Sequence, residues 1–231
     1  MNEKPNNISE MAKVYEKNTR ISIPSYDTLF SMVQSYFRMK LKEKEARILV
    51  VGAGGGNEIS AWGPSNPQWT FTGVDPSEEM IRIAKNKTIQ LGVESRVQLI
   101  QGTIDDLPTP NYTFDAASCI LVLHFIDGIQ EKLKLLTSIK ENLTSGAPFV
   151  LVSAYGDPES TELQDRLQIW KSFWLVGGAE SSKVEELVTK GIMKISFIPE
   201  NQIQWLLAEA GFTNITRFYS TGLFGGWMCH A

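Results

Sequence analysis

Short apolar segments alternate with segments of helical periodicity along most of the chain. The short segments are rich in β-branched or aromatic residues and are followed by turn-forming residues, which is the pattern of strands buried in a parallel sheet. They lie at residues 46–52, 69–75, 96–102, 114–123 and 148–154. Helical patterns lie between them at residues 57–62, 77–91 and 128–143. Strands that alternate with helices indicate βαβ units, so we predict an α/β fold with a doubly wound, mostly parallel sheet.

Three segments lie outside this alternation. Residues 1–45 carry a helical stripe of apolar side chains, which predicts an N-terminal helical cap over the sheet or a docked helix without ligand contact. Residues 156–198 predict a helical insertion, or lid, after the fifth strand. Residues 199–231 predict a last helix and an antiparallel pair of edge strands. These two strands complete a seven-stranded sheet around the core region, residues 46–155, and we expect residues 1–231 to form a single domain.

The composition narrows the class of protein. The formal net charge is −4 and shows no basic excess, so nucleic acid is not the expected partner. The two cysteines, Cys119 and Cys229, suggest neither a disulfide framework nor a metal site. The N-terminal residues are polar, and no run of about 18 apolar residues occurs. We therefore expect a soluble cytoplasmic protein that binds no metal or membrane, either as a monomer or as a homodimer.

A glycine-rich turn follows the first predicted strand. The segment ILVVGAGGGNEIS begins at Ile48 and places glycines at 52 and at 54–56. In an open parallel sheet, ligands bind beyond the carboxyl ends of the strands, where glycines let the backbone approach the ligand closely. The dinucleotide pattern G-x-G-x-x-G would require its last glycine at the position of Asn57. The turn is therefore less suited to a pyrophosphate, which disfavours a nicotinamide-dependent oxidoreductase.

An acidic residue follows the second predicted strand. Asp75 lies about 20 residues beyond the glycines, the spacing at which a carboxylate accepts hydrogen bonds from both hydroxyls of a ribose. The alternative is a carboxylate that caps the next helix. The segments QGTIDDLP and ASCILVLHFID follow the third and fourth strands and emerge at the same edge of the sheet. The four loops together predict a crevice for a nucleoside.

These motifs resemble those of the class I S-adenosylmethionine-dependent methyltransferases. The resemblance covers residues 46–155 and rests on VVGAGGGNE, FTGVDPSEEMI, QGTIDDLP and FDAASCILVLHFI. It implies a Rossmann-like fold and S-adenosylmethionine as the cofactor. It also implies that the glycine turn contacts the methionine part of the cofactor and that the acid after the second strand holds the ribose. By position, the implied cofactor-binding residues are Gly52, Ala53, Gly54, Asp75, Pro76 and Met80.

The resemblance further implies that Thr103 and Ile104 flank the adenine. Many members of the superfamily have aspartate at the position of Thr103. This difference leaves Asp105 or the backbone as alternative partners of the adenine amino group.

The flanking segments resemble one branch of this superfamily, which contains carboxy-S-adenosylmethionine synthase, an enzyme that serves tRNA modification. The similar segments are RISIPSYDTLFSMV, QGTIDDL and AGFTNITRFYSTGLFGGWMC. This resemblance implies that Tyr26 and Ile120 contact the cofactor. The synthase binds its extra carboxylate with an arginine, but this chain has no arginine between Arg166 and Arg217. Ile120 also replaces a polar side chain of the synthase, so ordinary methyl transfer is favoured over the carboxylated cofactor.

Methyl transfer from a sulfonium depends mainly on the placement of the acceptor, and it needs a base only when the acceptor must lose a proton. His124 follows the fourth strand and is the candidate catalytic residue, for acceptor positioning or for proton removal. The alternative is a histidine hydrogen-bonded to backbone. An aromatic stripe predicts either plain core or the wall of a pocket for a small, partly apolar acceptor. It comprises Trp170, Phe173 and Trp174, with Phe224 and Trp227 near the end of the chain.

The favoured function is therefore an S-adenosylmethionine-dependent methyltransferase with a small-molecule acceptor. A protein that binds the cofactor without catalysis and a tRNA-modification enzyme related to the synthase are the alternatives.

Overall fold

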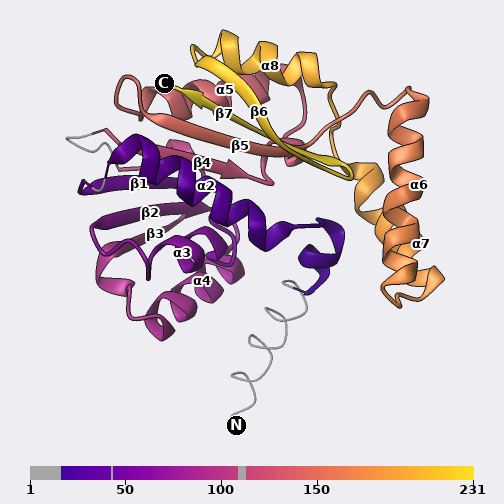
Figure 1. Cartoon of the computed structure of the whole chain (residues 1–231), viewed down its shortest axis with the longest axis horizontal. Coiled ribbons are helices and arrows are strands. Elements are labelled where there is room, and N and C mark those ends of the chain that lie inside the picture. The colour runs from indigo at the N-terminus through magenta and orange to yellow at the C-terminus, as the bar shows by residue number, and fades with distance from the viewer. Residues whose placement is uncertain (1–16, 43, 109–112) are drawn as a thin grey trace.

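The centre of the fold is a seven-stranded sheet with the strand order β3-β2-β1-β4-β5-β7-β6 (Figure 1). The structure is a computed structural model, which describes residues 17–42, 44–108 and 113–231. β1 to β5 are parallel to one another, and β7 is antiparallel to both β5 and β6. The strands are β1 (Ala46–Val51), β2 (Trp69–Asp75), β3 (Val97–Gln101), β4 (Ala116–Ile120), β5 (Pro148–Ala154), β6 (Thr213–Thr221) and β7 (Phe224–His230). The predicted α/β fold is confirmed.

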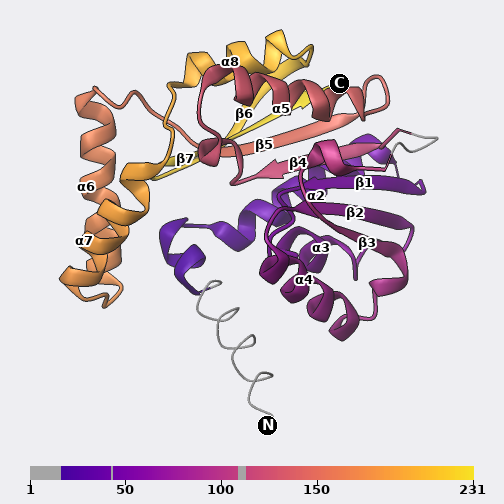
Figure 2. The ribbon, with the colours of Figure 1, turned by 180° about the vertical axis from the view of Figure 1, so that it is seen from behind.

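Helices cover both faces of the sheet, and they fill two apolar clusters (Figures 1 and 2). Ile48 and Val50 of β1 belong to the cluster that includes residues of α2 and α3, whereas Leu49 and Val51 belong to the cluster that includes residues of α5 and α8. The alternation follows from the two-residue period of a strand. The covering helices are α2 (Tyr26–Leu41), α3 (Asn57–Trp62), α4 (Glu78–Gln90), α5 (Ile129–Glu141) and α8 (Glu200–Glu209).

The fourth strand is shorter than the predicted segment 114–123. Its apolar run continues beyond Ile120, but Leu121 has a positive φ of 63° and a 3-10 turn follows at Leu123–Phe125. The apolar residues after Ile120 therefore belong to a turn at the carboxyl end of the sheet. This turn carries His124.

Two helices lie at one end of the molecule, α6 (Thr161–Val176) and α7 (Ser181–Lys190) (Figures 1 and 2). They form the helical insertion predicted after the fifth strand. Trp170 Nε1 in α6 donates a hydrogen bond to the backbone oxygen of Ser22 at 2.9 Å, and Arg166 Nε donates to that of Gly222 at 2.9 Å. The insertion is thus fixed to the segment before α2 and to the turn between β6 and β7. Of the helices in the described ranges, none has the length and hydropathy required to span a membrane.

Candidate active site

A cavity of about 430 Å³ lies at the carboxyl ends of β1, β2 and β4, and we call it the cofactor crevice. Eight of the ten residues predicted to bind the cofactor line it. They are Tyr26, Gly52, Ala53, Gly54, Asp75, Pro76, Met80 and Ile120. The remaining lining residues are Gly55, Asn57, Glu58, Leu121, Val122, Phe125 and Ile126. The crevice is thus a shell of apolar side chains and exposed backbone with two carboxyl groups.

The glycine turn needs glycine at its first position. Gly52 has a φ of 72°, and a Cβ placed on it would lie 2.1 Å from Val122 Cγ2. The backbone nitrogens of Gly52 and Ala53 both donate to the backbone oxygen of Val74 at 2.9 Å, which ties the turn to the end of β2. Gly54 also has a positive φ, of 48°. Glycine tolerates this conformation without steric cost, so the turn can present bare backbone to a ligand.

Two backbone amides orient the carboxylate of Asp75. Its Oδ2 accepts a hydrogen bond from the nitrogen of Gly54 at 2.8 Å, and its Oδ1 accepts one from the nitrogen of Ser77 at 2.9 Å. The Ser77 hydroxyl in turn caps α4, accepting from the nitrogen of Met80 at 3.3 Å. Since each carboxylate oxygen can accept more than one hydrogen bond, both retain capacity for the hydroxyls of a ribose. Asp75 therefore fixes the glycine turn and still faces the crevice.

A chain of hydrogen bonds anchors Tyr26 at the rim of the crevice. Lys87 Nζ donates to Asn57 Oδ1 at 2.8 Å, and Asn57 Nδ2 donates to the hydroxyl oxygen of Tyr26 at 2.9 Å. Tyr26 is the first residue of α2, so the chain connects the N-terminal helix to α3 and α4. The N-terminal segment thus contributes directly to the wall of the crevice, as the cap interpretation predicts.

Glu58 is a second carboxyl group in the crevice that sequence reasoning did not single out. It lies in the first turn of α3 and is 4% exposed. Its pKa is raised to about 8, mainly by burial and also by the charge of Asp75, against the lowering effects of its own backbone amide and of Lys87. Glu58 is therefore mostly protonated near pH 7. The signal in the sequence was the acid two residues after the last glycine, which resembles an ordinary helix start.

A second cavity of about 300 Å³ adjoins the cofactor crevice, and we call it the acceptor cavity. The two share Leu121 and Phe125. Among the described residues, no Asp, Glu, Lys or Arg lines the acceptor cavity. Its wall consists of Asn18, Thr19, Ser22, Ile23, Leu121, His124, Phe125, Trp170, Leu187, Gly191, Ile192, Ile195 and Phe224. The site thus joins a polar-edged crevice to a largely apolar, uncharged chamber.

His124 lies in the wall of the acceptor cavity with a fixed ring. Its Nδ1 accepts a hydrogen bond from the backbone nitrogen of Ala154 at 3.0 Å and lies 3.2 Å from the Ser153 hydroxyl. Because a backbone N–H can only donate, Nδ1 is unprotonated and the neutral ring carries its proton on Nε2. Nε2 has no hydrogen-bond partner within the part of the chain that the structure describes. The neutral ring therefore keeps one free hydrogen-bond donor, its Nε2–H, in a residue that lines the cavity.

Burial lowers the pKa of His124 to about 3, with the charge of Lys132 as a second cause. Lys132 is itself buried and donates to the backbone oxygens of Leu123 and Ile126 at 2.7 Å each, which fixes the turn that carries the histidine. An imidazole with this pKa and tautomer does not remove a proton at neutral pH. The geometry of His124 therefore favours acceptor positioning over proton removal. The hydrogen bond to backbone, which was the predicted alternative, is also present.

Residues 49–149 match the family model described as a methyltransferase domain. The uncharacterized methyltransferase YcgJ of Bacillus subtilis is 31% identical over 121 residues, which are 52% of this chain and 45% of that protein. The ubiquinone/menaquinone biosynthesis C-methyltransferase UbiE of Yersinia pestis is 26% identical over 156 residues, 64% of this chain and 58% of that protein. Residues 49–149 of this chain are thus similar to methyltransferase domains, in agreement with the predicted resemblance. The chain spans about half the length of these curated relatives.

Solved structures of two superfamily members share the fold. The plantazolicin methyltransferase BpumL, solved in complex with SAH, has a TM-score of 0.69 at 16% identity and covers 98% of this chain and 91% of its own. An O-methyltransferase family 2 protein from Planctomyces limnophilus, in complex with apigenin, has a TM-score of 0.61 at 18% identity, with coverage of 82% and 51%. These structures confirm the predicted fold, and the methyltransferase relatives support the predicted superfamily. The resemblance of the flanks to the carboxy-S-adenosylmethionine synthase branch stays a prediction.

The residues of the crevice fit the cofactor of the superfamily. Asp75 offers carboxylate oxygens for the two ribose hydroxyls, and Glu58 offers a carboxyl group for the ammonium of the methionine part. The bare backbone of the glycine turn permits close approach, and Met80 and Ile120 provide an apolar wall. The volume of about 430 Å³ lies within the range of roughly 300–1,000 Å³ that is usual for small-molecule sites.

Thr103 and Ile104 do not line the cofactor crevice. Thr103 donates from its backbone nitrogen and its hydroxyl to Asp106 Oδ2, at 2.8 and 3.1 Å, and Ile104 is buried in the core. Asp105, the alternative, forms an ion pair with Lys134 at 3.0 Å. The loop still adjoins the site, since the nitrogen of Gly102 donates to the backbone oxygen of Asp75 at 2.9 Å. Contact of this loop with adenine stays a prediction.

The predicted aromatic stripe divides among several environments. Trp170 and Phe224 line the acceptor cavity. Phe173 is 47% exposed, whereas Trp227 is fully buried against Tyr155 in the cluster on the opposite face of the sheet. Trp174 is buried next to Trp170 but lines a different cavity. The stripe is thus partly pocket wall and partly core.

Proposed function

We propose that the protein transfers the methyl group of S-adenosylmethionine to a small, largely apolar molecule bound in the acceptor cavity. The observation that carries the proposal is the shared wall: the acceptor cavity and the cofactor crevice meet at Leu121 and Phe125. A molecule in one cavity is therefore the neighbour of a molecule in the other. When bound, the cofactor supplies a methyl group that the positive charge of its sulfonium has already activated.

The side chains of the crevice bind and orient. Asp75 accepts hydrogen bonds from the ribose, and its two backbone partners keep the carboxylate in place before the ligand arrives. Glu58 faces the methionine part. Because the pKa of Glu58 is about 8, pairing with an ammonium group favours loss of its proton, so the cofactor and this carboxyl are linked through pH.

The side chains of the acceptor cavity position the acceptor and exclude water. Nε2–H of His124 is available to donate a hydrogen bond to an oxygen or nitrogen of the acceptor. No carboxylate, lysine or neutral-pH imidazole base lines the described wall. The acceptors that suit this site are therefore nucleophiles that reach it ionised, such as an acidic phenol, or that react without first losing a proton.

Two observations bear on the alternatives. An acceptor cavity beside the crevice favours an enzyme over a protein that only binds the cofactor. Neither the crevice nor the acceptor cavity is lined by a lysine or arginine among the described residues, which disfavours tRNA as the acceptor. The complex of the Planctomyces protein with apigenin supports an aromatic molecule as the acceptor class. We also propose a cytoplasmic location, because Cys119 and Cys229 are both buried free thiols.

The test combines binding and transfer. Calorimetry with S-adenosylhomocysteine measures whether the crevice binds the nucleoside, and NAD serves as the control ligand. S-adenosylmethionine with a tritiated methyl group is then incubated with the protein and a panel of hydroxylated aromatic compounds. We expect binding of S-adenosylhomocysteine and transfer to at least one acidic phenol. Binding without any transfer favours the non-catalytic alternative, and absence of binding refutes the proposal.

A further inference from the structure

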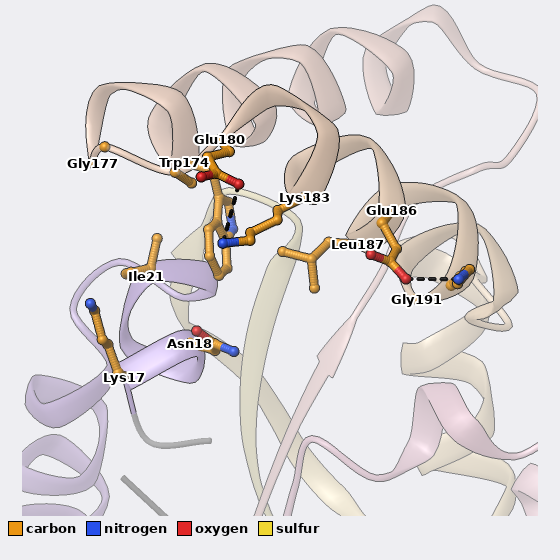
Figure 3. Close-up of a pocket in the computed structure, with 13 residues that line it drawn as sticks. Lys17, Asn18, Ile21, Trp174, Gly177, Glu180, Lys183, Glu186, Leu187 and Gly191 are labelled. Carbon is orange, nitrogen blue, oxygen red and sulfur yellow. Dashed lines mark hydrogen bonds and ion pairs between the residues drawn. The ribbon is translucent and has the colours of Figure 1, made fainter. Parts of the chain in front are cut away.

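A third cavity, of about 730 Å³, lies between the helical residues 17–22 and the hairpin of α6 and α7 (Figure 3). We call it the outer chamber. It shares Asn18, Leu187 and Gly191 with the acceptor cavity, which in turn shares Leu121 and Phe125 with the cofactor crevice. The three cavities therefore stand in a row, with the acceptor cavity in the middle. A ligand that fills the acceptor cavity can continue into the outer chamber past Leu187.

The polarity of the wall changes along this row. In contrast to the uncharged acceptor cavity, the outer chamber is lined by three lysines and two glutamates, which are Lys17, Lys183, Lys190, Glu180 and Glu186. Lys183 pairs with Glu180 at 3.2 Å (Figure 3), and Lys190 pairs with Glu186 at 2.7 Å. All four side chains are largely exposed, so the pairs hold them weakly. Lys17 has no ion pair within the described residues, which leaves the wall with an excess of positive charge.

Two neighbouring indoles mark the two chambers. Trp170 lines the acceptor cavity, and its Nε1 is satisfied by the backbone oxygen of Ser22. Trp174, one turn later in α6, lines the outer chamber with its ring centroid 5.6 Å from that of Trp170. The Nε1 of Trp174 is buried and has no acceptor in the described part of the chain. The Nε1 atoms of Trp69 and Trp227 are buried without a partner in the same way, so the feature of Trp174 that bears on a ligand is its place in the wall of the chamber.

We propose that the acceptor is an elongated amphipathic anion. Its largely apolar end, which carries the methylated atom, lies in the acceptor cavity beside His124. Its remote end extends into the outer chamber and carries an anionic group, such as a carboxylate, that faces Lys17 in the wall that Trp174 also lines. This inference rests on the proposed function for the identity of the acceptor end, and it adds the length, polarity and direction of the molecule.

The matched probes for the test are 6-(1-naphthyloxy)hexanoate and the corresponding hexanamide, which differ only in the charge of the remote group. The protein is labelled with 5-fluorotryptophan, and the ¹⁹F resonances of its six tryptophans are assigned with Trp→Phe variants. We expect the carboxylate to shift the Trp170 and Trp174 resonances and to leave Trp205, an exposed residue of α8, unchanged. We expect it to bind about fivefold more tightly than the amide, the effect of one partly exposed ion pair.

The variant Lys17→Glu should abolish the preference for the carboxylate, whereas Lys194→Glu, an exposed residue outside the chamber lining, should keep it. Equal affinities for the two probes, no binding of either, or a Trp174 resonance that stays in place would overturn the inference. Calorimetry with S-adenosylhomocysteine on the same samples reports on the proposed function alone. If the protein binds this nucleoside but does not respond to the probes as expected, only the inference of an amphipathic acceptor is refuted, and the proposed function stands.

Discussion

Replacement of Glu58 by glutamine should change how the stability of the protein depends on pH. The carboxyl titrates near 4.5 in the unfolded chain, and burial raises its pKa to about 8 in the folded protein. Between these values the folded state holds the proton and the unfolded state has lost it. The free energy of unfolding therefore falls as pH rises through this window, by up to about 1.4 kcal/mol per pH unit, and the contribution is complete only at lower pH.

Glutamine is a neutral side chain of the same shape that cannot titrate. From pH 5 to pH 7, the stability of Glu58→Gln relative to the wild type should therefore rise by roughly 2–3 kcal/mol. Urea unfolding of the ligand-free proteins, followed by tryptophan fluorescence at pH 5, 6 and 7, measures this difference. The difference between the free energies of unfolding of the two proteins cancels the contribution of every other titrating group that the substitution leaves unchanged.

The matched control is Glu78→Gln, an exposed acid in the first turn of α4. Its stability relative to the wild type should stay constant over the same pH range. If the difference between Glu58→Gln and the wild type is equally constant, the carboxyl is ionised in the folded protein at pH 7. Its proposed link with the ammonium of the cofactor would then be wrong.

Three further predictions concern the site. Asp75→Ala should weaken S-adenosylhomocysteine binding by roughly 1–3 kcal/mol in calorimetry, the usual cost of a stranded buried partner, and unchanged affinity would refute the ribose role. His124→Ala should reduce methyl transfer more than nucleoside binding. Because the pKa of His124 is about 3, the pH profile of wild-type kcat should show no inflection near pH 6.5. An inflection there that is lost in the variant would restore the role of general base. Gly52→Ala should lower the free energy of unfolding by about 1–3 kcal/mol because the new Cβ meets Val122. Gly92→Ala, also at positive φ but with open space around it, should lower this free energy less. Equal decreases in thermal unfolding would assign the whole effect to backbone strain.

Local patterns explain why the sheet and the crevice could be predicted from the sequence. The central strands β1, β4 and β5 are buried on both faces, so each is a nearly continuous run of apolar or small residues. Gly52 directly follows β1 and Asp75 is the last residue of β2. Because β1 and β2 are paired, the two residues lie close together in space. The location of the crevice could therefore be predicted from the ends of two strands and the turns that follow them.

The state of His124 depends on contacts that are distant in the sequence. The backbone nitrogen of Ala154, at the end of β5, determines the tautomer, and Lys132 from α5 contributes to the low pKa. The proposal that the histidine positions the acceptor or removes its proton could be narrowed only when these elements were placed together. Spacing along the chain carries no information on which ring nitrogen is engaged.

The aromatic residues near the end of the chain show a different kind of failure. Phe224 and Trp227 are three positions apart, a spacing that would bring them together on a helix but points them to opposite faces of a strand. β7 therefore places Phe224 in the acceptor cavity and Trp227 in the opposite core. In α6, Phe173 is exposed because the insertion packs against the rest of the molecule on one side. A shared aromatic character did not identify a shared surface.

Different segments of the chain form the walls of the cofactor crevice and the walls of the other two cavities. Most of the cofactor crevice is made by turns of the sheet, whereas the acceptor cavity and the outer chamber take much of their walls from residues 17–23, α6, α7 and the turn after α7. Under the proposed function, substitutions in these outlying segments would change which acceptor fits and leave the walls of the cofactor crevice unchanged. Grafting the insertion between relatives is thus a direct route to new acceptor selectivity on a constant scaffold.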